Sequence, residues 1–117
     1  MAGGIVVSDK KAVSIGSGPF HIIVEKIREC FEPGEEGVRA SVFSPMDDGG
    51  MQFISAVDLS PEDYMVFYKA VKRTYRAFED EHDLIVDQEV WDEIFGAFRD
   101  EEQRISDRSR ENVRHES

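Results

Sequence analysis

Cysteine is almost absent from this sequence, because Cys30 is the single cysteine among 117 residues. One cysteine excludes an internal disulfide and a metal site of several thiolates, and it favours a reducing environment. Long apolar runs are also absent: the longest, residues 20–24, is interrupted by His21, so no segment is expected to span a bilayer. Residues 1–4 lack the basic region and apolar core of a signal peptide. These absences predict a cytoplasmic protein without a membrane partner.

Basic residues are scarce relative to acidic ones. The chain has 14 Lys and Arg against 25 Asp and Glu, which gives a formal net charge of −11 and a pI near 4.6. Residues 1–105 carry 22 of the acids and 11 of the bases, so the whole excess precedes a neutral tail. Such a surface repels nucleic acid and anionic membranes, and it suits either a basic protein partner or simple solubility.

The first third of the chain predicts a hairpin and a helix. Residues 5–8 and 12–15 are short runs rich in β-branched side chains, separated by the polar residues 9–11. Residues 16–19, Gly-Ser-Gly-Pro, then break the second strand and prepare a helix start. From residue 20 to residue 31 apolar side chains recur at helical spacing, with charged side chains on the other side.

The middle of the chain predicts a second hairpin. Apolar and polar residues alternate over residues 38–43 and again over residues 51–59. Residues 44–50 contain Pro, Asp and Gly, which are typical of a turn between two strands. Because Phe43, Ile54 and Ala56 add apolar side chains to the second face, we expect that face to be partly covered.

Two helices are predicted after this hairpin. Ser60 is a good N-cap, Pro61 suits the first helical position, and the apolar stripe that follows ends at Phe78. Asp87 is placed to cap a last helix over residues 88–105. Residues 106–117 are polar with balanced charge, which predicts a frayed helix end or a disordered tail.

The predicted fold class is therefore α+β, with the order ββαββαα. The simplest arrangement is a four-stranded antiparallel sheet of two hairpins, with three helices mainly on one face. Residues 1–105 form a single domain in this prediction, and residues 106–117 form a polar C-terminal tail.

Two polar clusters are candidate ligand sites. Asp80, Glu81, His82, Asp83 and Asp87 are of types that bind metal ions, but their spacing fits no calcium loop, so we predict a solvated loop without a metal. A basic stripe could grip a phosphate or an acidic peptide, or it could pair with the acidic face of the last helix or with its own neighbours. The stripe consists of Lys69, Lys72, Arg73 and Arg76.

The leading functional hypothesis is a small acidic protein-interaction module, of the inhibitor, immunity or chaperone-like kind, that neutralises a basic partner. Long-range attraction would steer such a partner to the acidic surface. The predicted contact residues are Glu79, Asp80, Glu81, Asp83, Glu89, Asp92 and Glu93, with Trp91 as an aromatic anchor.

Two other classes remain open at this point. A homodimeric structural or regulatory protein would pair through its open sheet edges or through its complementary helix faces. An enzyme would need a pocket, and the sequence contains no recognisable nucleophile, metal or cofactor motif. No cofactor, catalytic residue or nucleic-acid partner is predicted.

Overall fold

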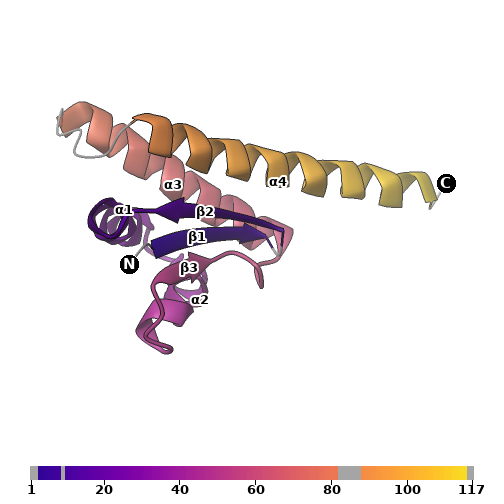
Figure 1. The fold of residues 1–117 in the computed structure, drawn as a ribbon. Helices are drawn as coiled ribbons and strands as arrows, with labels where there is room; N and C mark the ends of the chain where they lie inside the picture. Colours follow the sequence, from indigo (N-terminus) through magenta and orange to yellow (C-terminus); the bar gives the residue numbers. More distant parts are fainter. Residues whose placement is uncertain (1–2, 9, 82–87, 116–117) are drawn as a thin grey trace.

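The computed structural model describes residues 3–8, 10–81 and 88–115, apart from the side chains of residues 17, 80, 81 and 108–115. Figure 1 shows the order of the elements along the chain. They are β1 (Gly3–Ser8), β2 (Lys11–Ile15), α1 (Ser17–Cys30), α2 (Glu36–Asp47), β3 (Phe53–Ser55), α3 (Pro61–Glu81) and α4 (Gln88–His115).

The sheet has the order β2-β1-β3, with β1 in the centre. β1 is antiparallel to β2, where Ile5 faces Val13, and parallel to β3, where Ile5 faces Ile54. All three of these side chains are buried, whereas Ser14 on the alternate position of β2 is exposed. The first predicted hairpin is thereby confirmed, and one face of the sheet forms the floor of the core.

The predicted four-stranded antiparallel sheet with three helices is wrong. Across the described residues the structure has a three-stranded mixed sheet and four helices, in the order ββααβαα. Residues 38–43 are not a strand, because they lie inside α2. The strand predicted over residues 51–59 is reduced to β3, which pairs in parallel with β1 instead of forming a second hairpin.

Local chemistry explains why the chain forms α2 in this place. Val38, Val42 and Met46 recur every four residues and lie on the side of α2 that packs on the core, together with Phe43. The turn before α2 requires Gly34, whose φ is +94° and whose N–H donates to the Glu36 carboxylate at 2.9 Å. Val38 and Val42 fall on the same face both in a strand, where side chains alternate, and in a helix, where residues four apart are neighbours. The local pattern alone therefore does not distinguish a strand from a helix here.

The long α3 helix is the centre of the packing. It packs against α1, α2 and α4, and α4 in turn packs on β1 and β2. Figure 1 shows α4 above the sheet and α3 slanting down behind the strands, with α1 at one end and α2 beneath β3. A salt bridge of 2.7 Å between Lys11 Nζ and Asp100 Oδ2 joins β2 to α4 at the surface.

The start of α3 is as predicted, and α4 is longer than predicted. The Ser60 side-chain oxygen accepts a hydrogen bond from the Asp63 N–H at 3.2 Å, so Ser60 caps the helix. α4 continues to His115, whereas the sequence predicted an end near Ile105. In the part of the chain that the structure describes, none of the helices is both long and apolar enough to cross a membrane.

Candidate functional site: a charged face on α3 and α4

The crossing of α3 and α4 is held by aromatic side chains around Phe98. The Phe98 ring lies 5.1 Å from the Tyr68 ring and 5.2 Å from the Phe67 ring, between centroids. The Tyr64 hydroxyl donates to the Phe98 carbonyl oxygen at 2.7 Å, and burial raises the pKa of this phenol so that it remains a donor. These contacts fix one helix against the other, and the side chains on their outer surfaces are therefore held in a defined arrangement.

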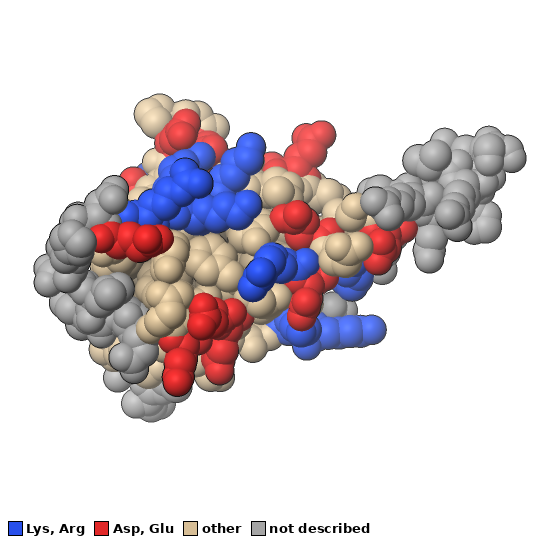
Figure 2. All heavy atoms as spheres, turned by 90° about the horizontal axis from the view of Figure 1, so that it is seen from above, with Lys and Arg blue, Asp and Glu red and all other residues tan. Residues whose placement is uncertain are grey.

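The outer surface of α3 carries a basic row, which we define as Lys69, Lys72 and Arg76. All three are exposed, and the Lys72 ammonium lies 4.1 Å from the centre of the Tyr68 ring in a cation–π contact. Among the described residues, no carboxylate forms an ion pair with any member of the row. Figure 2 looks onto this side of the molecule and shows a basic cluster and an acidic cluster with uncharged atoms between them, whereas elsewhere on the face acidic and basic side chains are mixed.

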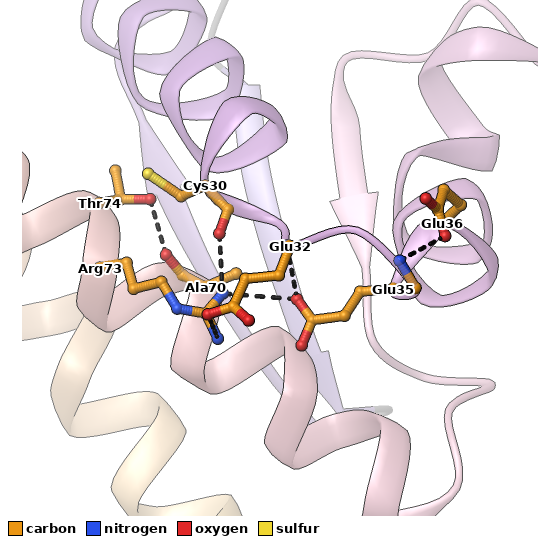
Figure 3. A network of polar contacts seen from close by, with 8 residues as sticks. Cys30, Glu32, Glu35, Glu36, Ala70, Arg73 and Thr74 are labelled. Atoms are coloured by element: carbon orange, nitrogen blue, oxygen red, sulfur yellow. Dashed lines mark hydrogen bonds and ion pairs between the residues drawn. The ribbon is translucent and has the colours of Figure 1, made fainter.

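Arg73 belongs to the same predicted stripe but turns inward. Its guanidinium donates to the Cys30 carbonyl oxygen at 2.8 Å and pairs with Glu32 at 3.2 Å and Glu35 at 3.4 Å. Figure 3 shows these groups converging where α1 ends and α2 begins. Arg73 therefore fastens α1 and α2 to α3. The other three residues of the stripe, Lys69, Lys72 and Arg76, face outward.

The first turns of α4 carry an acidic row, which we define as Glu89, Asp92 and Glu93. All three are exposed. Asp92 is oriented by a chain of hydrogen bonds, since Gln88 donates its side-chain amide to Asp92 at 3.1 Å and Tyr75 donates its hydroxyl to Gln88 at 3.1 Å. Glu79 is also exposed, near the end of α3.

An aromatic groove lies between the two rows. It has a volume of about 300 Å³ and is lined by Tyr68, Tyr75, Gln88, Asp92, Phe95 and Arg99. The Tyr75 and Phe95 rings meet edge to face with centroids 5.3 Å apart, and both side chains are half-buried. Burial raises the pKa of Tyr68, helped by the nearby Glu102 charge. An apolar centre with charged margins is the arrangement found in many protein–protein interfaces.

Not every predicted contact residue reaches this surface. Trp91 is fully buried beneath the groove, 5.4 Å from the Tyr75 ring and 5.7 Å from the Phe78 ring between centroids. Among the described residues its indole N–H has no hydrogen-bond partner. Tyr75 and Phe95 take the surface position that was expected of Trp91, and helical periodicity does not separate the centre of an apolar stripe from its edge. The side chains of Asp80 and Glu81, and the whole of Asp83, lie outside the described residues.

The candidate metal ligands are only partly described. His82, Asp83 and Asp87 lie outside the described residues, as do the side chains of Asp80 and Glu81. In the remainder of the chain no three His, Cys, Asp or Glu side chains come together in a group that could hold a metal ion.

Comparison with known proteins places this chain near a bacterial immunity protein. No protein-family model matches it. In sequence it is 29% identical over 99 residues to the immunity protein CdiI of Burkholderia pseudomallei, which covers 85% of this chain and 91% of that protein. In structure it is similar to one chain of a solved complex, which is described as the CdiA-CT toxin from B. pseudomallei E479 in complex with cognate CdiI immunity protein. That similarity has a TM-score of 0.79 at 28% identity and covers 84% of this chain and 94% of the other.

Proposed function

We propose that this chain is an immunity protein, which binds a protein toxin and thereby neutralises it. The observation that carries the proposal is the agreement of two likenesses, one in sequence and one in fold, each covering more than four fifths of both chains. The sequence match is an immunity protein, and the structural match is a chain of a toxin–immunity complex. The acidic interaction module predicted from composition belongs to the same functional class.

We assign toxin binding to the charged face of α3 and α4. The acidic row would meet a basic surface of the toxin, and the net charge of −11 would attract that surface from a distance. The basic row, on the other side of the aromatic groove, would accept acidic side chains of the same partner. Opposite charges on the two margins would then allow one orientation of the toxin and disfavour the reverse.

Neutralisation on this model requires binding and no chemical step. Charged margins accelerate association, whereas the apolar groove, from which water is excluded on docking, governs how slowly the complex dissociates. Tyr75 and Phe95 are suited to slowing dissociation, because they are rigid, half-buried aromatic side chains at the centre of the face. A toxin whose working surface is covered in this way is inactive for as long as the complex lasts.

The first test is to capture the partner and to measure protection. The immobilised chain is incubated with lysate of its own host in low-salt buffer, and the bound protein is released by high salt and identified. That protein is then expressed in a surrogate bacterium with and without this chain. We expect arrested growth in the first case and restored growth in the second. A captured protein that leaves growth unchanged, or whose toxicity this chain does not relieve, would contradict the proposed function.

The assignment to the acidic row is tested with charge reversals in the same assay. Asp92→Lys together with Glu93→Lys should abolish protection. The matched control is Glu25→Lys with Glu29→Lys, which makes the same change of charge at two exposed positions of α1 and should preserve protection. If both double variants protect equally well, the acidic row is not the contact surface, although the proposed function would stand.

A further inference from the structure

One edge of the sheet lies open along β2. In β1 the Gly4 N–H points toward β3, because it donates to the carbonyl oxygen of Gln52, the residue before β3, at 3.1 Å. Gly4 lies opposite Ser14 in the antiparallel pairing of β1 with β2, so these two residues form a non-hydrogen-bonded pair. The backbone N–H and C=O groups of Ser14, and those of Ala12 two residues earlier, therefore point away from β1. Among the described residues these outward groups have no hydrogen-bond partner.

A hollow lies beside this edge, between β2 and α4. Its volume is about 570 Å³, and its walls include Val13 of β2 together with Gly96 and Ala97 of α4. A Cβ atom added at Gly96 would have nothing within 4 Å, so the space over this residue is empty. Glu93 and Asp100 of α4 are the acidic residues of the same hollow. The open backbone edge is thus accompanied by space on the helical side of the sheet.

We propose that β2 pairs with an extended segment of a partner protein, which becomes a fourth strand of the sheet. Such a segment satisfies the outward backbone groups of Ala12 and Ser14. In an antiparallel arrangement the residue between these two pairs lies opposite Val13, and opposite residues share a face of the sheet. Its side chain therefore points into the hollow over Gly96 and Ala97. The backbone pairing provides affinity, and the hollow accepts a small apolar side chain.

The charges around the hollow indicate which kind of segment fits. Asp100 is paired with Lys11 at 2.7 Å, whereas Glu93 is exposed and forms no ion pair with another described residue. α4 runs opposite to β2 (Figure 1), so Glu93 lies toward the Ser14 end of the strand. A basic side chain of the segment would meet Glu93 there. The net charge of −11 also favours a basic partner over a second copy of this chain.

The β2 edge is continuous with the charged face. Residues 92, 95 and 99 of α4 line the aromatic groove, whereas residues 93, 96 and 100 line the hollow beside β2. These two sets lie on neighbouring sides of one helix, and Glu93 belongs both to the acidic row and to the hollow. The inference rests on the proposed function for the identity of the partner, because the segment would belong to the toxin that contacts the charged face.

A synthetic strand tests the inference without the toxin. The probe is the peptide acetyl-Arg-Thr-Val-Thr-Arg-amide, in which valine is placed opposite Val13, the threonines opposite Ala12 and Ser14, and an arginine near Glu93. It is titrated into the full chain labelled with ¹⁵N, and we expect saturable shifts of the backbone amide signals of Ala12, Ser14 and Gly96. The control peptide carries N-methyl groups on both threonines. It has the same charge but lacks the two pairing donors, so it should bind about tenfold more weakly.

Two variants locate the binding site. Ala12→Pro removes one outward N–H, which an edge strand tolerates, and it should weaken peptide binding about fivefold. Ala12→Val keeps this N–H and is the matched control, with unchanged binding expected. Gly96→Leu provides an independent test, because it fills the hollow from an empty position of α4, and it should weaken binding about tenfold. Circular dichroism checks that each variant is folded.

Four results would overturn the inference. Three are absence of saturable shifts at the highest soluble concentration, equal affinity for the N-methylated peptide, and unchanged binding in a folded Gly96→Leu variant. The fourth is a dimer by light scattering in which the Ala12 and Ser14 amides already exchange slowly, since a second copy would then occupy the edge. Each of these leaves capture of a toxin, and protection against it, unaffected. Failure of the capture experiment would not alter the peptide titration, so the two proposals can fail separately.

Discussion

At the scale of single residues, Gly3 shows how closely the sheet approaches α1. A Cβ atom added at Gly3 would lie 2.3 to 2.5 Å from three atoms of the Phe20 ring. Phe20 is itself 1% exposed and is surrounded by core side chains, so it has no room to move aside. Glycine at this position is a packing requirement, which allows β1 to lie flat against the first turn of α1.

We predict that Gly3→Ala lowers the free energy of unfolding by about 1–3 kcal/mol, the usual cost of overpacking a rigid core. The measurement is urea unfolding followed by circular dichroism. Gly18→Ala is the matched control, because nothing lies within 4 Å of the added Cβ and the residue is exposed in α1. It should be neutral or slightly stabilising, by up to about 1 kcal/mol. Equal losses in the two variants would contradict the packing argument.

Asp47 makes the stability of the fold depend on pH. The Arg28 guanidinium donates two hydrogen bonds of 3.0 Å to the Asp47 carboxylate and lowers its pKa. Because the pKa of Asp47 is lower in the folded state than in the unfolded state, the ion pair contributes its full stabilisation at pH values above the unfolded-state pKa of about 4. This contribution disappears as the pH falls through the folded-state pKa. The pair joins α1 to the end of α2, so acid should loosen that junction.

We predict that the free energy of unfolding of Asp47→Asn falls less steeply with decreasing pH than that of the original protein. Urea unfolding at a series of pH values from neutral to below the unfolded pKa measures the slope for each protein. Asp58→Asn is the control, since Asp58 is exposed and forms no ion pair with the described residues, and its curve should follow the original protein. Parallel curves for the original protein and Asp47→Asn would show that the pair contributes nothing.

At the scale of elements, Arg73 determines how the first two helices sit on α3. Its guanidinium hydrogen-bonds both to the last residue of α1 and to the segment leading into α2, through Cys30 and Glu35. Arg73→Gln should therefore lower the free energy of unfolding by about 1–2 kcal/mol, because the carbonyl and carboxylate groups lose a charged donor. Lys69→Gln, on the exposed basic row, should change it by less than about 0.5 kcal/mol. Thermal or urea unfolding of the two variants compares these values directly.

The accuracy of prediction from sequence differed between elements for physical reasons. α1, α3 and α4 are stabilised by local signals, such as the Ser60 cap and long helical stripes, and sequence reasoning found them. β3 is defined by a parallel pairing with β1, in which Ile54 lies opposite Ile5. No local pattern encodes a partner so far away in the chain. The sequence predicts a turn at Pro45, but a proline in the last turn of α2 removes only one backbone donor, and the helix includes it.

The candidate site shows the same division. The exposed charges of α3 and α4 follow from helical periodicity, and they lie on the helices that the sequence predicted. The inward orientation of the Arg73 side chain depends on Glu32 and Glu35, which lie about forty residues earlier in the chain. Glu101, which is buried on α4, lines one hollow together with residues at the ends of β1 and β3. Tertiary contacts of this kind leave no trace in local spacing.

At the scale of the whole molecule, the excess of acidic residues opposes folding. A net charge of −11 on a body of about 51 × 30 × 30 Å places many like charges within reach of one another. Salt screens this repulsion more than it weakens the few surface ion pairs, whose individual contributions are small. We therefore expect added sodium chloride at neutral pH to raise the free energy of unfolding, by on the order of 0.5 kcal/mol. A decrease with salt, measured by urea unfolding, would show that the ion pairs outweigh the repulsion.

The central place of β1 in the sheet has a consequence for synthesis on the ribosome. β1 and β2 emerge together and can pair at once, but β3 follows only after α1 and α2 have been made. Until then one edge of β1 has its backbone donors and acceptors unpaired, and a nascent hairpin with an open edge can pair with other chains. Slowing elongation between Ile15 and Phe53 should lengthen that interval, so the yield of folded protein should depend on the rate of translation through α1 and α2.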